Sequence, residues 1–210
     1  MKTKRIALFT SIGRVGQDIA REALDRGYKL TVIVNDTKEF KLEHPGLTLM
    51  KGDVNKSEDV IRCAKNHDII IYDQELKQHQ EGEYYNATRS VVIACKSLGN
   101  KRLIISGHIH PTNSEMKKEE LDAWKPVQEE QFAALEFLKR KLDIDWSYFY
   151  ILETDSIKKS SDTGNDFLVV NPKKNIKISI KDYAESILNE VEKDENKPLD
   201  NMRTLVMDNA

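Results

Sequence analysis

Short apolar runs alternate with helical stretches along most of this chain, and that alternation limits the folds open to it. Mainly apolar segments predict strands at 6–9, 30–34, 47–50, 68–72 and 102–106. Between them, apolar residues recur at helical spacing in 14–26, 58–65 and 85–98. Apolar strands joined through helices are typical of a parallel sheet covered on both faces. The expected fold class is therefore α/β, with a doubly wound parallel sheet.

The second half of the chain continues this pattern less regularly. Helices are expected at 125–142 and from Ser179 to about residue 193. Ser179 and Asp182 resemble a capping box, with Asp in the place usually taken by Glu or Gln. Further strands are expected at 146–150, 176–180 and 202–207, and polar loops at 107–121 and 156–165.

The domain organisation follows from length and from the absence of a linker or repeat in the sequence. A chain of 210 residues suits one domain with a sizeable core. We expect a single domain over 1–210, with a nucleotide-binding core at about 1–150 and a segment at about 151–210 that covers the ligand crevice.

Charge and hydropathy narrow the partner classes. With 33 basic and 35 acidic side chains, the net charge of −2 gives no basic excess for a nucleic-acid backbone. No apolar run approaches the roughly 20 residues that cross a membrane. The apolar stretch after the basic N-terminus ends at Thr10 without a cleavage site, so a cytoplasmic protein is expected. Cys63 and Cys95 lack Cys-x-x-Cys spacing and are interpreted as buried thiols.

The loop after the first strand, 10–16, is the main candidate for nucleotide binding. Gly13 and Gly16 match the glycines that let a backbone approach a pyrophosphate and a helix pack on a strand, while Thr10 replaces the usual first glycine. The following helix offers N–H groups and a positive dipole to an anion. The alternative is an ordinary strand–helix turn with a packing glycine. The expected cofactor contacts here are Thr10, Ser11, Gly13, Arg14 and Val15.

Residues that follow the next strands complete the predicted cofactor site. Asn35 and Asp36 end the second strand, where a carboxylate favours the ribose diol of NAD and an arginine favours NADP. Asp53 and Val54 follow the third strand, where an acid could bond the adenine amino group. For Asp36 and Asp53 the alternative is a turn or cap role. The fourth strand adds Tyr72 and Asp73 to the predicted cofactor contacts.

Several segments together resemble the NmrA-like, NAD(P)H-binding group of atypical short-chain dehydrogenases. Besides the glycine loop and Gly52-Asp53-Val54, similar motifs recur over nearly the whole chain: Ala87-Thr88-Arg89, 101–107, Leu142-Asp143-Ile144-Asp145-Trp146-Ser147, Thr163-Gly164 and 178–184. The group includes flavin, quinone and biliverdin reductases, and proteins that bind NAD(P) without known catalysis. The resemblance implies a Rossmann fold and a nicotinamide cofactor.

The chain also departs from this group at several positions. Its loop usually reads Gly-Ala-Thr-Gly-x-x-Gly, which Thr10 and Ile12 break. Many members carry an arginine for NADP where Asn35 stands. Tyr72-Asp73 adds bulk and charge after the fourth strand, and 150–152 lacks the usual proline.

The chemistry expected at the site is limited by a missing residue pair. No tyrosine lies between Tyr85 and Tyr148, so the usual Tyr-x-x-x-Lys pair of short-chain dehydrogenases is absent from its expected helix. Hydride transfer to a flavin or quinone needs less help, because the acceptor carries the redox chemistry. Ser106 and His108 follow the fifth strand and are the candidates to donate or relay a proton, unless the histidine is simply solvated. His108-x-His110 lacks a third ligand, so no metal site is predicted.

Two functions follow as hypotheses. The first is an NAD(P)H-dependent oxidoreductase, with NAD favoured over NADP, that reduces a flavin, quinone or similar flat acceptor. The alternative is a non-catalytic NAD(P)-binding or partner-binding protein. In that case the altered loop either binds a dinucleotide without catalysis or binds no dinucleotide. A small-molecule acceptor is the expected partner in the first case, and a homodimer is compatible with both. A sugar-nucleotide epimerase is disfavoured, because the chain is short and lacks the proton-transfer tyrosine.

Overall fold

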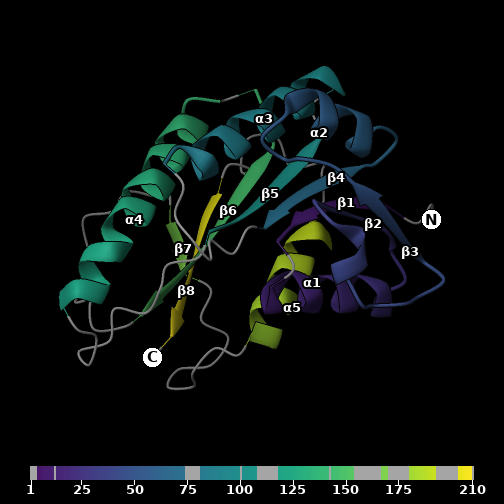
Figure 1. Ribbon diagram of the computed structural model, residues 1–210, viewed down its shortest axis with the longest axis horizontal. Helices are drawn as coiled ribbons and strands as arrows, with labels where there is room; N and C mark the ends of the chain where they lie inside the picture. Colours follow the sequence, from purple (N-terminus) through teal and green to yellow (C-terminus); the bar gives the residue numbers. More distant parts are fainter. Residues whose placement is uncertain are drawn as a thin grey trace.

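The computed structural model describes residues 4–11, 13–73, 81–99, 101–107, 118–141, 143–153, 167–169, 180–192 and 203–209. Within these ranges eight strands form one sheet in the order β3-β2-β1-β4-β5-β6-β8-β7 (Figure 1). Every neighbouring pair runs parallel. The strands are β1 Arg5–Thr10, β2 Lys29–Val34, β3 Leu47–Lys51, β4 Ile69–Asp73, β5 Arg102–Gly107, β6 Trp146–Glu153, β7 Phe167–Val169 and β8 Arg203–Asn209.

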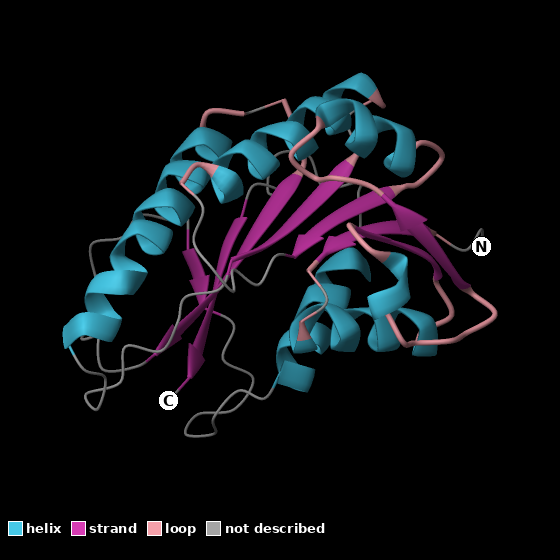
Figure 2. Cartoon of the chain, in the orientation of Figure 1, coloured by secondary structure: helices cyan, strands magenta, loops and turns pink. Residues whose placement is uncertain are grey.

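Helices cover both faces of this sheet (Figure 2). On one face lie α1 (Arg14–Asp25) and α5 (Ile180–Glu192), which pack against each other. On the other face lie α2 (Ser57–Ala64), α3 (Glu83–Ser97) and α4 (Lys118–Lys139), while a short 3-10 turn, η1 (Thr37–Glu39), follows β2. Doubly wound packing of this kind confirms the expected Rossmann-like α/β fold.

The alternation of side chains along β1 divides the core into two layers. Ile6 and Leu8 point toward α1 and α5, whereas Ala7 and Phe9 belong to the core under α2, α3 and α4. All four are at most 1% exposed, because a central strand of a doubly covered sheet has no solvent face.

The chain adds strands to one side of β1 first and then to the other side, so the order of strands reverses between β1 and β4. From β1 the chain moves outward to β2 and β3, then returns to the other side of β1 and continues through β4, β5 and β6. Such a reversal leaves a crevice at the carboxyl ends of the two central strands, because their connections leave in opposite directions. The functional site is therefore expected at the ends of β1 and β4.

A buried ion-pair group attaches α5 to the middle of the sheet. Arg102 on β5 donates to Glu190 Oε1 on α5 at 2.7 Å and to Ser147 Oγ on β6 at 2.9 Å, and it also pairs with Asp145. The side chains of Arg102 and Glu190 are 6% and 1% exposed. This contact places α5 over the sheet from a distant part of the chain.

Three sequence expectations differ from the observed elements. Helix α4 begins at Lys118, inside the predicted loop 107–121, and contains Pro126 in its interior. Strand β7 was not predicted. The expected strand 176–180 falls mostly outside the described residues, and Ile180 is the first residue of α5. No helix in the described ranges is long and apolar enough to cross a membrane.

Candidate functional site

The first turn of α1 opens toward the crevice at the carboxyl end of β1. Gly13 is the N-cap residue with extended backbone (φ −85°, ψ 175°), and as a glycine it offers no side chain to cap the helix. The first N–H groups of an α-helix have no partner within the helix. A helix N-terminus at the carboxyl end of a strand is the kind of place that binds a phosphate, because its N–H groups and dipole favour an anion.

Gly16 is required because α1 passes very close to the ends of two strands. A Cβ atom at position 16 would lie 1.9 Å from Thr10 Oγ1 and 3.1 Å from Asp73 Oδ2. The threonine in place of the first glycine thus fills space that the glycine at 16 leaves open. The two positions are linked, and glycine at 16 performs the helix-packing role that the sequence predicted.

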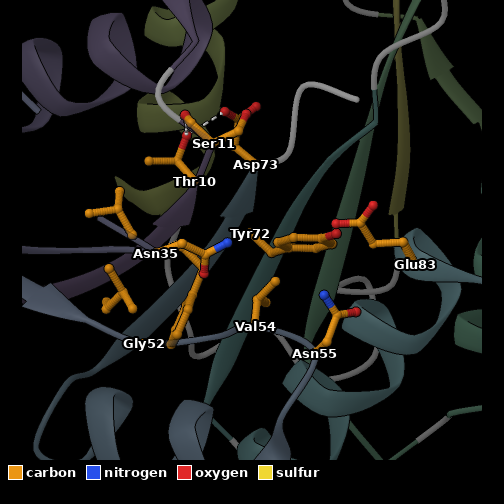
Figure 3. Close-up of a pocket in the computed structure, with 12 residues that line it drawn as sticks. Thr10, Ser11, Asn35, Gly52, Val54, Asn55, Tyr72, Asp73 and Glu83 are labelled. Carbon is orange, nitrogen blue, oxygen red and sulfur yellow. Dashed lines mark hydrogen bonds between the residues drawn. The ribbon is translucent and has the colours of Figure 1, made fainter. Parts of the chain in front are cut away.

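A pocket occupies the crevice at the β1/β4 reversal (Figure 3). Tyr72 lies in its middle, between Asn35 on one side and Glu83 on the other. Residues from the ends of β1, β2, β3, β4 and α3 line it: Phe9, Thr10, Ser11, Ile33, Val34, Asn35, Gly52, Val54, Asn55, Tyr72, Asp73 and Glu83.

A row of hydrogen-bonded polar side chains borders the pocket at the strand ends. Thr10, Asp73 and Ser106 are register partners on β1, β4 and β5. Ser106 Oγ donates to Asp73 Oδ1 at 2.8 Å, and Thr10 Oγ1 lies 3.0 Å from Asp73 Oδ2. The hydroxyl of Tyr183 on α5 is 2.9 Å from Ser106 Oγ. Burial, together with the nearby Asp73 charge, raises the pKa of Tyr183, although its bond to Ser106 opposes the change.

Three tyrosines pack together on the other side of the sheet. The rings of Tyr72 and Tyr84 are 5.5 Å apart between centroids, and the hydroxyls of Tyr84 and Tyr148 are 2.9 Å apart. Burial raises the pKa of Tyr72 well above its ordinary value, so its phenol stays protonated. A Cβ atom at Gly107 would lie 2.7 Å from the Tyr148 hydroxyl, so this cluster requires glycine at the end of β5.

Six of the predicted cofactor residues meet at the pocket: Thr10, Ser11, Asn35, Val54, Tyr72 and Asp73. Gly13 and Arg14 stand at the adjacent start of α1, with Arg14 exposed. The Val15 side chain instead packs into the core beneath α1 and is 8% exposed. It can contribute only its backbone to a ligand at the crevice.

Three other predicted site residues, Asp36, Asp53 and Ser106, are not among the described residues that line the pocket. Asp36 accepts from Lys38 N at 3.0 Å as the cap of η1, and Asp53 accepts from Asn55 N at 3.0 Å in its own turn. Neither aspartate is among the described residues that line the pocket. Both make the turn hydrogen bonds that were expected as the alternative to cofactor binding. Ser106 is fully buried beneath the crevice, bonded to Asp73, while His108 lies outside the described residues.

The sequence analysis missed two polar residues of the lining, Asn55 and Glu83. Asn55 directly follows Val54, a predicted cofactor contact, so its position after the third strand could have identified it as a lining residue. Glu83 opens α3, where an acid is usual in any helix, and only the fold brings it to the crevice. Another acid, Glu130 on α4, accepts from Tyr85 N in the first turn of α3 at 2.9 Å. Among the described residues, no three metal-binding side chains are grouped.

Comparison with known proteins connects this geometry to a nucleotide. The model of the NAD(P)H-binding family matches residues 11–194. The protein YwnB of Bacillus subtilis is 25% identical over 211 residues, covering 92% of this chain and 94% of YwnB. The oxidoreductase ylbE of Lactococcus lactis superposes with a TM-score of 0.69 at 16% identity, covering 98% of this chain and 91% of its own. A Streptococcus pneumoniae protein described as a "putative NADH-flavin reductase" superposes with a TM-score of 0.60 at 20% identity, over 90% and 93% of the two chains.

Proposed function

Because the chain belongs to the NAD(P)H-binding family, we propose that it is an oxidoreductase that uses NAD(P)H to reduce a flavin, quinone or similar flat acceptor. The observation that carries this proposal is the pocket at the β1/β4 reversal, next to the N-terminus of α1. Ligands of open α/β sheets bind at this place, and a dinucleotide brings its pyrophosphate to such a helix end.

The residues around the pocket fit the parts of a dinucleotide. The first-turn N–H groups of α1 and the exposed Arg14 would hold the pyrophosphate, because both favour negative charge. Asn35 at the end of β2 would face the adenosine ribose, and Val54 with Asn55 would border the adenine. When bound, the nicotinamide supplies the hydride. The protein supplies binding, orientation and exclusion of water.

The charge of the pocket favours NADH over NADPH. Its lining includes the carboxyl groups of Asp73 and Glu83, and no lysine or arginine is among the described lining residues. An additional 2′-phosphate would add negative charge without a cation in that lining to receive it. The preference for NADH does not depend on Asp36, because the carboxyl group of that residue caps η1.

The acceptor class rests on two supports. The large buried ring of Tyr72 gives the pocket an aromatic floor, which suits a flat molecule. One structural neighbour is described as a "putative NADH-flavin reductase". It is 20% identical to this chain, so the likeness supports the fold rather than the substrate. We also propose that residues 151–210 help to cover the acceptor, and that Ser106 supports proton delivery by holding Asp73 in place through its hydrogen bond.

The test is acceptor-dependent oxidation of NADH and NADPH by the purified protein. Menadione and FMN serve as the quinone and flavin acceptors, and the uncatalysed rate is subtracted. We expect saturable turnover, faster with NADH, that Asn55→Trp abolishes by filling the pocket from its exposed edge. Lys56→Trp, one residue further along and outside the lining, should retain it. Cofactor binding without turnover with any acceptor would instead support the non-catalytic NAD(P)-binding alternative.

A further inference from the structure

The Asp73 carboxyl group is buried at the point where the crevice meets the sheet. It is 1% exposed and nevertheless lines the pocket. Both of its oxygens have hydroxyl partners, Ser106 Oγ at 2.8 Å from Oδ1 and Thr10 Oγ1 at 3.0 Å from Oδ2. Burying a carboxylate is costly even when it is hydrogen-bonded. A carboxyl group in this position is therefore expected to have a use that an amide or a hydroxyl would not serve.

The Thr10 hydroxyl gives this carboxyl group two stable hydrogen-bonding states. Thr10 Oγ1 lies 3.0 Å from Asp73 Oδ2 and 2.5 Å from the carbonyl oxygen of Ser11, but it has only one hydrogen to donate. When Asp73 is ionised, Thr10 donates to Oδ2. When Oδ2 carries a proton, Asp73 donates to Thr10, which then donates to the Ser11 carbonyl. A rotation of one hydroxyl hydrogen accommodates both states, and no heavy atom has to move.

The other oxygen of Asp73 is held in place by a chain that reaches α5. Ser106 donates to Oδ1, and the Tyr183 hydroxyl lies 2.9 Å from Ser106. Ser106 and Tyr183 are both fully buried. Because Ser106 can keep donating to Oδ1 in both states, the carboxyl group stays oriented while Oδ2 gains or loses its proton.

We propose, on the basis of the oxidoreductase function above, that Asp73 is the catalytic acid of this site. Hydride addition to a quinone leaves a hydroquinone anion. Asp73 turns its Oδ2 proton from Thr10 to that oxygen and transfers it, which forms the neutral hydroquinone, while Thr10 turns its own hydrogen from the Ser11 carbonyl to the new carboxylate. The carboxylate then regains a proton from solvent, so one NAD(P)H and one external proton are consumed for each quinone reduced. Thr10, Ser106 and Tyr183 are positioning residues that hold Asp73 in both states.

The first test compares acceptors that differ in their need for a proton. Menadione requires one after hydride addition, whereas the cationic dye methylene blue becomes neutral on accepting a hydride and requires none. In Asp73→Asn we expect the ratio of menadione to methylene blue turnover to fall about 100-fold, the usual size of a general-acid contribution. Asp25→Asn removes an exposed carboxyl group at the end of α1 and should leave the ratio unchanged.

Variants at Thr10 test the positioning step. Thr10→Val keeps the shape but removes the hydroxyl and should lower the same ratio, whereas Thr10→Ser should restore it. An unchanged ratio in Asp73→Asn, with wild-type turnover present, would overturn the assignment of Asp73. Absence of wild-type turnover with both acceptors would instead overturn the oxidoreductase function itself.

A second test needs neither cofactor nor turnover. Infrared difference spectra of the free protein, wild type minus Asp73→Asn, follow the carbonyl stretch of protonated Asp73 as the buffer is acidified. The titratable side chains described around it are Tyr183 on α5, Tyr72 on β4 and Glu83 on α3. The Asp73 band should shift in Thr10→Val, which removes its hydrogen-bond partner, and not in Thr10→Ser. An identical band in the wild type and both Thr10 variants would contradict the two-state arrangement.

Discussion

At the scale of single residues, the site depends on pairs of positions that are far apart in the printed sequence. Thr10 and Gly16 compensate for each other across the α1 turn, and Asp73 joins them from β4. Sequence reasoning located six of the lining residues, because they follow predicted strands whose ends meet at one edge of a sheet. For Asp36 and Asp53 it left a ligand-binding role and a turn role open, since such aspartates look alike in sequence, and their hydrogen bonds fit the turn role.

Gly16→Ala tests the link between Thr10 and Gly16. Alanine usually stabilises a helix interior by about 1 kcal/mol relative to glycine. Here its Cβ would lie 1.9 Å from Thr10 Oγ1, so the substitution should destabilise the protein by about 1–3 kcal/mol. Urea unfolding of Gly16→Ala, Thr10→Gly and the double variant gives the coupling free energy. The same cost for Gly16→Ala in both backgrounds would show that the two side-chain positions do not compete for space.

Asn35→Arg tests the source of the NADH preference. Asn35 is exposed at the end of β2 and lines the pocket, so an arginine there should be tolerated and should reach a 2′-phosphate. We expect the ratio of NADPH to NADH affinity to rise about tenfold, equivalent to about 1.4 kcal/mol. Calorimetric titration measures both affinities, with Asn35→Gln as the uncharged control. An unchanged ratio would place the adenosine ribose elsewhere.

At the scale of secondary-structure elements, the regular core was predictable and the connections were not. The central strands were found because a buried parallel strand is an apolar run bounded by turn residues. The start of α4 was missed because the polar stretch up to about residue 121 was interpreted as a loop, whereas the helix had already begun at Lys118. Strand β7 has only three residues and its place depends on pairing with β8, which local sequence does not specify.

The attachment of α5 gives a prediction at this scale. Glu190→Gln removes the charge that faces the buried Arg102 and should lower the free energy of unfolding by about 3 kcal/mol. Glu192→Gln, on the same helix, breaks an ion pair with Arg26 in which Glu192 is 52% exposed, and should cost less than about 1 kcal/mol. Urea unfolding compares the two variants. Equal costs would mean that the buried ion pair does not anchor α5.

At the scale of the whole molecule, strand order and function are connected. The reversal between β1 and β4 follows from two right-handed windings of the chain, and it creates the crevice whatever the details of the loop. The sequence therefore located the crevice at the strand ends more readily than the hydrogen bonds that its side chains make. The buried row from Thr10 to Tyr183 spans three strands and α5, so no local motif could reveal it.

The central claim, that the crevice at the β1/β4 reversal binds a nicotinamide dinucleotide, is tested most directly by thermal unfolding with increasing NADH. At about 100 times its Kd, the cofactor should stabilise the fold by about 2.7 kcal/mol and raise the Tm by about 5–10 °C. The account predicts this shift for the wild type and for Lys56→Trp, and its loss in Asn55→Trp. Equal shifts in Asn55→Trp and the wild type, or no shift with millimolar NADH or NADPH, would contradict it.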